Sequence, residues 1–251
     1  MNSERTERMR LIVAEGADET RARILAQKLG ISPETTTEEE GPALRLDADG
    51  LSLIDGELAM RGDFMRILPR LQKGRLAGEM LVKAAKRKQY GERALAIDAT
   101  AGLGEDSILL AAAGFEVRMY EYDPVIAALL ADALERARSI PELAEPVSRM
   151  TLCEENSIEA MRKLAVRPDV VLLDPMFPER RKSALIKKKF QLLQQLERPC
   201  SDEDELLEAA LHSGARRIII KRPLKGPYLA EKKPDYSLNG KAIRYDCIIV
   251  P

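Results

Sequence analysis

The stretch ALAIDATAGLGEDSILLAAAG, residues 94–114, constrains the fold of this chain more than any other segment. An apolar run that ends in Asp98 leads through a short loop with two glycines into a second apolar run. Glycines permit tight turns and close approach of the backbone, and acidic residues are favoured at a helix N-terminus. The stretch therefore predicts a buried parallel strand, a loop for a nucleotide-like ligand and a helix, although the glycines alone also fit a plain strand-to-helix turn. The loop and helix-start residues are Gly102, Gly104, Glu105 and Asp106.

After residue 93, strand-like and helix-like segments alternate, a pattern that predicts a doubly wound α/β sheet. The expected strands are ALAID, EVRMYEY, RMTLCEE, DVVLLD and ARRIIIKRP. The last strand-like segment, AIRYDCIIV, follows a loop that is too short to hold another helical crossover, so we expect it to be antiparallel. The predicted fold class is therefore α/β, with a mostly parallel sheet and an antiparallel last strand.

The N-terminal part of the chain predicts a small α/β subdomain of its own. RLIVA is typical of a short strand, and Asp18 and Gly30 suit the N-terminal and C-terminal caps of the helix between them. Alternating apolar and polar residues on each side of Asp49 and Gly50 predict a β-hairpin. The expected domains are the subdomain over residues 1–62 and a larger domain over residues 63–251.

The composition limits the chemistry and the location that we expect. The chain has 251 residues, of which 45% are hydrophobic and 32% charged, as in soluble globular proteins. It has no apolar stretch long enough to span a bilayer, and its N-terminus lacks the apolar core of a signal peptide, so we expect a cytoplasmic protein without a membrane partner. Three scattered cysteines and a single histidine, His212, predict no metal site and no histidine-based catalysis. We expect His212 at the surface or at a helix end.

Basic residues gather in two places although the formal net charge is only −1. The overall charge gives no case for nucleic-acid binding, so a polyanion would have to meet a local patch. Residues 61–88 and residues 179–189 are such patches, and each is alternatively the solvated face of a helix. Within the first patch, residues 74–88 carry apolar side chains at helical spacing, which predicts one helix that leads into the first core strand and is placed to act as a lid.

Polar side chains stand at the carboxyl ends of the expected parallel strands. They are Asp98, Glu121, Asn156 with Ser157, and Asp174. In open α/β sheets, ligands bind at this edge. Glu121 ends the second strand, where a carboxylate can accept hydrogen bonds from both hydroxyls of a ribose. One nucleoside can reach all of these positions, so the set favours a nucleoside-binding site over ordinary loop chemistry.

The sequence DPMFP, which begins at Asp174, is the most specific chemical element. Pro175 and Pro178 fix the backbone and lack N–H groups, which leaves Asp174 and nearby carbonyls as hydrogen-bond acceptors. Phe177 offers a face for a planar ring. Acceptors beside an aromatic face suit the exocyclic amine of a nucleobase, which donates its N–H groups while its lone pair meets an electrophile. The alternative is a proline-stiffened turn with a buried Phe.

The chain resembles the S-adenosylmethionine-dependent methyltransferases in four segments, DATAGLGED, EYDPVIAALL, LLDPMFPERRKSALIKKK and IIIKRP. It is most similar to the ribosomal RNA small subunit methyltransferase J family, from about residue 62 to the C-terminus. The resemblance implies a Rossmann-like fold, S-adenosylmethionine as cofactor, and methylation of N2 of a guanine in small-subunit (16S) ribosomal RNA or in the small subunit itself. It carries the family's cofactor contacts to Glu105, Asp106, Glu121, Tyr122, Asn156, Ser157 and Asp174.

The same resemblance implies individual roles. Glu121 would hold the ribose, Tyr122 would flank the adenine, and Asp174 would lie between the cofactor and the base. Asp174 and Phe177 are then the expected catalytic residues, with Phe177 stacked on the base, and Asp98 is an organiser of the glycine loop rather than a catalytic acid. The expected substrate contacts are Pro175, Phe177, Arg180, Arg181, Lys187, Lys188, Lys189, Lys221 and Arg222.

Three other functions fit parts of the sequence. An amino-methyltransferase acting on adenine in DNA or RNA would use the same DPMFP element, because this element recognises an exocyclic amine but does not specify which base carries it. A nicotinamide-dependent oxidoreductase would explain the glycine loop and Glu121, but it leaves DPMFP unexplained. A non-catalytic RNA-binding or assembly factor would keep the methyltransferase fold without the activity.

Overall fold

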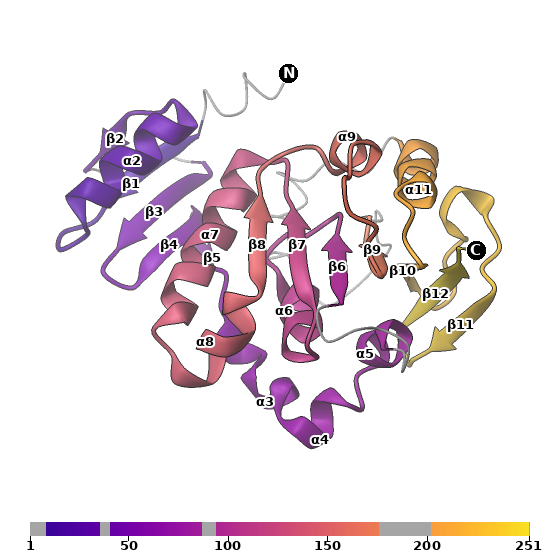
Figure 1. The fold of residues 1–251 in the computed structure, drawn as a ribbon. Coiled ribbons are helices and arrows are strands. Elements are labelled where there is room, and N and C mark those ends of the chain that lie inside the picture. Colours follow the sequence, from indigo (N-terminus) through magenta and orange to yellow (C-terminus); the bar gives the residue numbers. More distant parts are fainter. Residues whose placement is uncertain (1–8, 36–40, 87–93, 176–201, 251) are drawn as a thin grey trace.

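In the computed structural model, the chain is described over residues 9–35, 41–86, 94–175 and 202–250 (Figure 1). These residues form two β-sheets, of which the N-terminal one is smaller. None of the helices in these four ranges is both long and apolar enough to cross a bilayer.

The first sheet belongs to the N-terminal part of the chain. Its strands are β1 (Arg10–Val13), β2 (Pro33–Glu34), β3 (Ala43–Asp47), β4 (Gly50–Asp55) and β5 (Leu58–Met60). They lie in the order β2-β1-β3-β4-β5, with β1 parallel to β2 and β3 and the remaining pairs antiparallel. The predicted β-hairpin is confirmed, because β3 and β4 pair from Asp47 opposite Gly50.

Helix α2 (Glu19–Leu29) follows β1, and both of its predicted caps are confirmed. The Asp18 carboxylate accepts the backbone N–H groups of Thr20 and Arg21 at 2.8 and 3.0 Å. These are two of the N–H groups that a helix start leaves without a partner. Gly30 ends the helix with φ of 68°, in the left-handed region that favours glycine.

The second sheet has seven strands among the described residues. They are β6 (Leu95–Asp98), β7 (Glu116–Tyr120), β8 (Met150–Cys153), β9 (Val170–Leu173), β10 (Arg217–Pro223), β11 (Tyr236–Asn239) and β12 (Ile243–Ile249). Their order is β11-β12-β10-β9-β6-β7-β8. Strands β6 to β10 pair in parallel, and β12 runs antiparallel to β10 and to β11. The predicted α/β fold with an antiparallel last strand is confirmed, and β11 is an additional strand that the sequence pattern did not indicate.

Helices cover both faces of this sheet. They are α3 (Leu68–Leu71), α4 (Lys73–Leu76), α5 (Met80–Ala85), α6 (Glu105–Ala112), α7 (Pro124–Arg138), α8 (Pro141–Ser148), α9 (Ser157–Arg162) and α11 (Glu203–His212), with short 3-10 turns η1 (Phe64–Arg66) and η2 (Leu229–Glu231). Successive side chains of a strand point to opposite faces of the sheet, so neighbouring residues are buried in different cores. Ala96 joins the core beneath α5, α6 and α8, whereas Ile97 joins the core beneath α9 and α11.

The expected single helix over residues 74–88 is wrong. The chain forms α4 and α5 instead, separated by residues 77–79. Gly78 disfavours a helix interior, and its N–H closes a turn onto the Arg75 carbonyl at 2.9 Å. Glu79 is extended, with φ of −60° and ψ of 131°. Apolar spacing alone overlooked this break.

Helix α7 joins the two sheets. Its Val125, Ala128 and Leu129 are buried in the same core as Leu51 and Leu53 of β4. Figure 1 shows the N-terminal sheet lying alongside α7, at the end of the molecule away from the C-terminus. The first sheet ends at Met60, and the domain boundary after residue 62 stays a prediction.

Candidate functional site

Asp98 ends β6 inside the protein rather than at the surface, with 2% of the residue exposed. Its Oδ2 accepts the Ser107 hydroxyl at 2.6 Å and its Oδ1 accepts the Thr100 N–H at 3.2 Å. Burial raises the pKa of Asp98 to about 7, while both hydrogen bonds act in the opposite direction. Asp98 thus ties the strand end to the loop and to α6, which supports its role as an organiser.

The loop after β6 needs its glycines. Gly102 and Gly104 have φ of 53° and 76°, in the region that residues with a Cβ rarely adopt. Gly104 is also tightly packed, since a Cβ there would stand 2.8 Å from Leu130 Cδ1 and 3.2 Å from Phe64 Cζ. The loop therefore runs close beneath η1 and α7 before α6 begins with Glu105 and Asp106.

Replacing Gly104 with alanine is expected to lower the free energy of unfolding by about 2 to 3 kcal/mol, because backbone strain and overpacking both contribute. Urea denaturation measures the loss. Gly16→Ala is the matched control, because Gly16 has φ of 78° and open space where the Cβ would lie. Strain alone should make that variant less stable by about 1 kcal/mol. Equal losses in both variants would show that Leu130 and Phe64 move aside at no cost.

Glu121, directly after β7, supports the glycine loop from the side. Its Oε2 accepts the Gly102 N–H at 3.0 Å and its Oε1 accepts the Asp123 N–H at 2.8 Å. Burial raises the pKa of Glu121 to about 7, and these N–H groups counteract the rise. A carboxylate has about four acceptor positions, so Glu121 can still accept a hydrogen bond from a ligand hydroxyl. Tyr122 beside it is 60% exposed and offers its ring to a planar group.

Asn156 and Ser157 follow β8, where α9 begins. The Asn156 Oδ1 caps this helix by accepting the N–H groups of Ile158 and Glu159 at 2.8 and 3.4 Å. Because this oxygen already accepts two helix N–H groups, a ligand contact from Asn156 would use its NH₂ group. The hydroxyl of Ser157, the first residue of α9, lies next along the chain.

Asp174 follows β9 and lies on the other side of the glycine loop from Glu121, because β6 stands between β9 and β7 in the sheet. Its backbone N–H donates to Thr100 Oγ1 at 2.7 Å, so the two strand ends are bonded directly. Its side chain is 39% exposed, and Pro175 after it is buried. Thr100 was not among the predicted site residues, since a hydroxyl in a loop gives no sequence signal for such a bridge.

The predicted RNA contacts have different outcomes. Phe177, Arg180, Arg181, Lys187, Lys188 and Lys189 lie outside the described residues. Arg222 is 1% exposed, with its Nε on the Pro227 carbonyl at 3.0 Å and its NH1 3.6 Å from Glu203. This burial corrects the prediction that Arg222 lines an RNA entrance. Lys221 also points inward, with Nζ 2.6 Å from Asp106 Oδ2 and 2.8 Å from Asp174 Oδ2.

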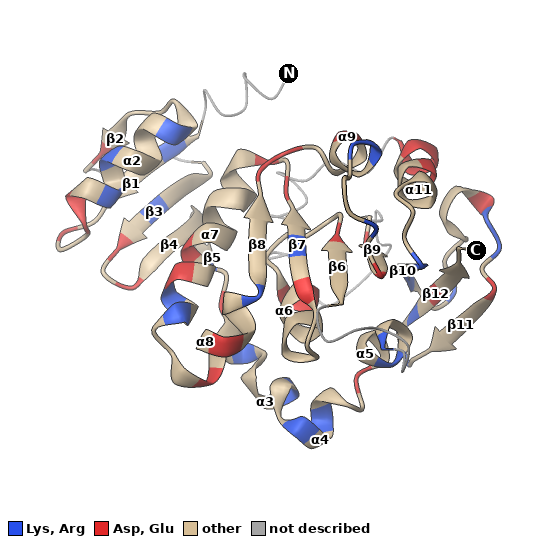
Figure 2. Cartoon of the chain, viewed as in Figure 1, with Lys and Arg blue, Asp and Glu red and all other residues tan. Residues whose placement is uncertain are grey.

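The basic patch near residues 61–88 is divided between the interior and the surface. Arg61 is half-buried and bonded to Asp47 and Ser52, and Arg70 forms a two-pronged pair with Glu79 at 2.8 and 2.9 Å. Figure 2 shows further Lys and Arg residues on α4 and α5. Among the described residues of this segment, up to residue 86, the exposed cations are Arg66, Lys73, Arg75, Lys83 and Lys86.

His212 lies at the exposed C-terminal end of α11, with Nδ1 2.8 Å from the Glu208 carbonyl oxygen, which confirms its predicted place. Over the parts of the chain that the structure describes, no three His, Cys, Asp or Glu side chains are grouped to hold a metal ion.

Together, the strand ends form a site with two halves. Glu121, Tyr122 and the glycine loop suit a nucleoside, and Asp174 supplies a partly exposed carboxylate beside them. This is the carboxyl edge of a parallel sheet, flanking the loop after its first strand, where open α/β folds bind nucleotides. The arrangement can hold a nucleoside cofactor and present a hydrogen-bond acceptor to a second molecule.

Comparison with known proteins gives one family. A family model described as "Putative SAM-dependent methyltransferase" matches residues 25–250. Two proteins named ribosomal RNA small subunit methyltransferase J are similar to this chain: that of Pseudomonas aeruginosa is 42% identical over 90% of this chain and 88% of its own length, and that of Thioalkalivibrio sulfidiphilus is 40% identical over 91% and 92%. The crystal structure of a SAM-dependent methyltransferase from Neisseria gonorrhoeae matches with a TM-score of 0.76 and 30% identity over 95% of each chain. The chain therefore belongs to the S-adenosylmethionine-dependent methyltransferases, in the ribosomal RNA small subunit methyltransferase J family.

Proposed function

We propose that this chain acts in the cytoplasm and transfers a methyl group from S-adenosylmethionine to the exocyclic N2 amine of a guanine in small-subunit ribosomal RNA. The observation that carries the proposal is Asp174, a partly exposed carboxylate held against the glycine loop through Thr100 at 2.7 Å. The names of the relatives support ribosomal RNA as the substrate class. Family membership removes the nicotinamide-dependent oxidoreductase alternative.

The residues at the strand ends fit the cofactor. The Glu121 carboxylate, which has acceptor capacity beyond its bonds to the Gly102 and Asp123 N–H groups, suits the ribose hydroxyls, and the exposed Tyr122 ring suits the adenine. S-adenosylmethionine supplies a methyl group that its positive sulfur has already activated. The proposed cofactor-binding residues are Asp98, Gly102, Gly104, Glu105, Asp106, Glu121, Tyr122, Asn156, Ser157 and Asp174.

The chain mainly positions the target amine. Asp174 would accept a hydrogen bond from the amine, hold the group and keep its lone pair available to the methyl group that S-adenosylmethionine supplies. The nitrogen–carbon bond would form as the carbon–sulfur bond breaks, S-adenosylhomocysteine would leave, and the surplus amine proton would pass to Asp174 or to water. Pro175 has no N–H and leaves the neighbouring acceptors free for substrate. Such orientation supplies much of the acceleration in a transfer whose donor is already reactive. By resemblance to the family, Phe177 would stack on the base, and Arg180, Arg181, Lys187 and Lys188 would contact phosphates.

Product analysis tests the proposal. The protein is incubated with S-adenosylmethionine carrying a labelled methyl group and with small-subunit RNA or small subunits that lack the modification. The RNA is then digested and the labelled nucleoside identified by mass spectrometry. N2-methylguanosine is expected. Detection of N6-methyladenosine would show that the target base is adenine rather than guanine. Absence of transfer to both the RNA and the small subunits would favour the non-catalytic assembly factor.

The affinities for RNA and for the cofactor should depend differently on salt concentration. If about four phosphates are neutralised by Lys and Arg, RNA affinity should fall roughly 50-fold between about 50 and 200 mM salt, because bound counterions are released. The affinity for S-adenosylhomocysteine should change less than about twofold, since its contacts are mostly hydrogen bonds and stacking. Filter binding and calorimetry measure the two affinities. Equal salt dependence of both would contradict the proposed phosphate contacts.

A further inference from the structure

We propose that Lys221 is a positioning residue for methyl transfer: its ammonium group links Asp106 to Asp174 and keeps Asp174 a charged hydrogen-bond acceptor for the substrate amine. The role of Lys221 in the reaction rests on the proposed function, whereas its effect on Asp174 can be measured without any substrate.

The geometry of the cluster joins three separate elements. Lys221 lies in β10, Asp106 in the first turn of α6, and Asp174 directly after β9. Lys221 Nζ stands 2.6 Å from Asp106 Oδ2 and 2.8 Å from Asp174 Oδ2. Distances below 3 Å are those of charge-assisted hydrogen bonds. One ammonium group therefore bridges the cofactor side of the site and the acceptor side.

Partial burial of the cluster strengthens these ion pairs. The side chains of Asp106 and Lys221 are 14% and 26% exposed, whereas that of Asp174 remains 39% exposed. An exposed ion pair contributes little because water screens it, and a partly buried one is screened much less. Asp174 is thus the member that a substrate can reach, and Lys221 lies behind it.

Asp174 is held at two points. Its N–H is bonded to Thr100, and its Oδ2 is bonded to Lys221. Across the described ranges of the chain, no donor is bonded to its Oδ1. The carboxylate is therefore fixed with one oxygen engaged and one left for the target amine.

Two carboxylates share a single cation here, so the charge on Lys221 is the main influence that favours the ionised form of Asp174. Burial nevertheless holds the pKa of Asp174 above its usual value, Lys221 lowers that pKa, and Asp106 raises it. Burial also works against the charge on Lys221, yet Asp106 and Asp174 raise its pKa well above the ordinary value. Lys221 is therefore charged throughout the range in which a carboxylate titrates.

Other titratable groups face the cluster, and none replaces Lys221. Burial and Asp106 raise the pKa of Tyr245 in β12, so its phenol is neutral. Asp98 in β6 adds negative charge when it ionises. Arg70 in α3 is paired with Glu79, and Arg222 in β10 acts on Asp174 less strongly than Lys221 does. Without Lys221, Asp174 would face Asp106 with little compensation.

The direct test is a titration of the free protein by NMR. Aspartate is labelled with ¹³C at the carboxyl carbon, and the Asp174 signal is identified by its loss in Asp174→Asn. In Lys221→Met the apparent pKa of Asp174 should rise by about 1 to 3 pH units, because an opposite charge has been removed. Lys221→Arg should restore most of the wild-type value. Lys225→Met removes a charge from an exposed lysine just beyond β10 and should leave Asp174 unchanged.

A second variant predicts the opposite sign and does not depend on the stability of Lys221→Met. Asp106→Asn removes the competing carboxylate and leaves Lys221 to Asp174 alone, so the apparent pKa of Asp174 should fall. An unchanged Asp174 pKa in both Lys221→Met and Asp106→Asn would overturn the proposal.

The kinetic test follows the same logic. Ionised Asp174 is a stronger hydrogen-bond acceptor than protonated Asp174, so in Lys221→Met the acid limb of the kcat profile should move to higher pH. On that limb, each pH unit of displacement lowers kcat about tenfold until the residual rate of the protonated acid is reached, and activity should recover in alkali. A loss that is equal at every pH would assign Lys221 a merely structural role. Absence of transfer by the wild-type protein would overturn the proposed function, whereas wild-type transfer with an unmoved Asp174 pKa would overturn only the role of Lys221.

Discussion

Replacing Asp174 with alanine is expected to slow methyl transfer about 10²- to 10⁴-fold, the usual contribution of a positioned acceptor or base. The Asp174 carboxylate accepts the Lys221 ammonium through Oδ2 and leaves Oδ1 for the target amine. Alanine removes that acceptor, so the amine is no longer held with its lone pair towards the methyl carbon. Asp174→Asn keeps an amide oxygen in the same position and should lose roughly tenfold to 100-fold. Initial rates of label transfer to small-subunit RNA measure both.

The matched control is Asp204→Ala, which removes an exposed carboxylate from α11 and should transfer methyl at the wild-type rate. The denaturation midpoint of each variant shows whether a lost rate reflects lost folding. Transfer at the wild-type rate by Asp174→Ala would show that another group holds the amine.

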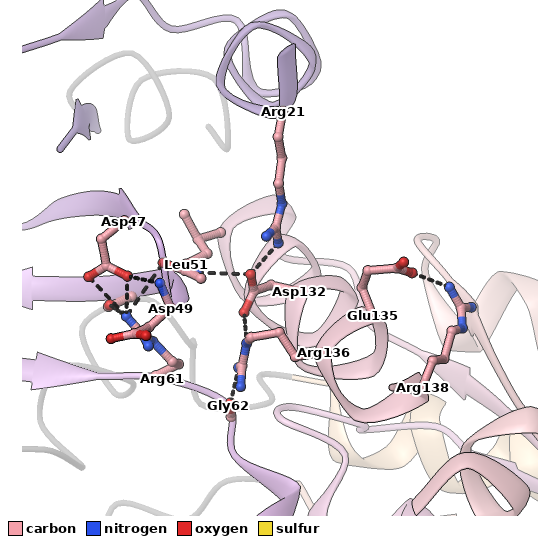
Figure 3. Close-up of polar contacts among 12 residues, drawn as sticks. Arg21, Asp47, Asp49, Leu51, Arg61, Gly62, Asp132, Glu135, Arg136 and Arg138 are labelled. Atoms are coloured by element: carbon pink, nitrogen blue, oxygen red, sulfur yellow. Dashed lines mark hydrogen bonds and ion pairs between the residues drawn. The ribbon is translucent and has the colours of Figure 1, made fainter. Parts of the chain in front are cut away.

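Replacing Asp132 with alanine is expected to lower the free energy of unfolding by about 3 kcal/mol, because it leaves one buried N–H group and two partly buried guanidinium groups without their acceptor. The Asp132 side chain in α7 is 1% exposed. Its Oδ1 accepts the Leu51 N–H of β4 at 2.8 Å and a guanidinium N–H of Arg21 in α2, and its Oδ2 accepts Arg136 Nε at 2.8 Å. Figure 3 shows these groups converging on the one carboxylate, with Arg136 reaching on to the Gly62 carbonyl.

Glu135→Ala is the control on the same helix. Glu135 and Arg138 also form an ion pair, but their side chains are 65% and 61% exposed, so its loss should cost less than about 1 kcal/mol. Asp132→Asn keeps an acceptor for Leu51 and loses the charge, and its stability should lie between alanine and wild type. Urea denaturation measures all three variants. A loss below about 1 kcal/mol in Asp132→Ala would mean that water reaches the two arginines and replaces the carboxylate.

These contacts make the N-terminal sheet part of the methyltransferase body in the folded state. Val125, Ala128 and Leu129 of α7 are buried against the first sheet, and Asp132 adds a polar link one turn further on. No local pattern predicts such a joint, since Asp132 and Leu51 are 81 residues apart and α7 reads as an ordinary amphipathic helix. A subdomain of about 60 residues is small for an independent core, so we expect its contacts with α7 to contribute much of its stability.

Features that depend on near neighbours were predictable. The Asp18 and Gly30 caps and the hairpin at Gly50 each involve residues a few positions apart, and all are confirmed. The failures have equally physical causes. Gly78 lies between two separate helices, α4 and α5, because a weak helix former outweighs the apolar spacing, and β11 pairs with β12 through residues that lack a strong strand pattern. Arg222 was taken as a surface cation because burial is not visible in composition.

Contiguous segments of the chain were enough to predict the α/β class, the glycine loop, the family and the polar residues at the strand ends, because periodic spacing and short motifs involve only near neighbours. How those residues meet depends on the folded structure. Asp106 and Lys221 are 115 residues apart in the chain and 2.6 Å apart in the fold. Their contact depends on the sheet order that sets β10 beside β9 and β9 beside β6, and this order arises from packing two cores at once. The same packing brings Lys221 Nζ within 2.8 Å of Asp174 Oδ2, a contact that no sequence pattern indicated.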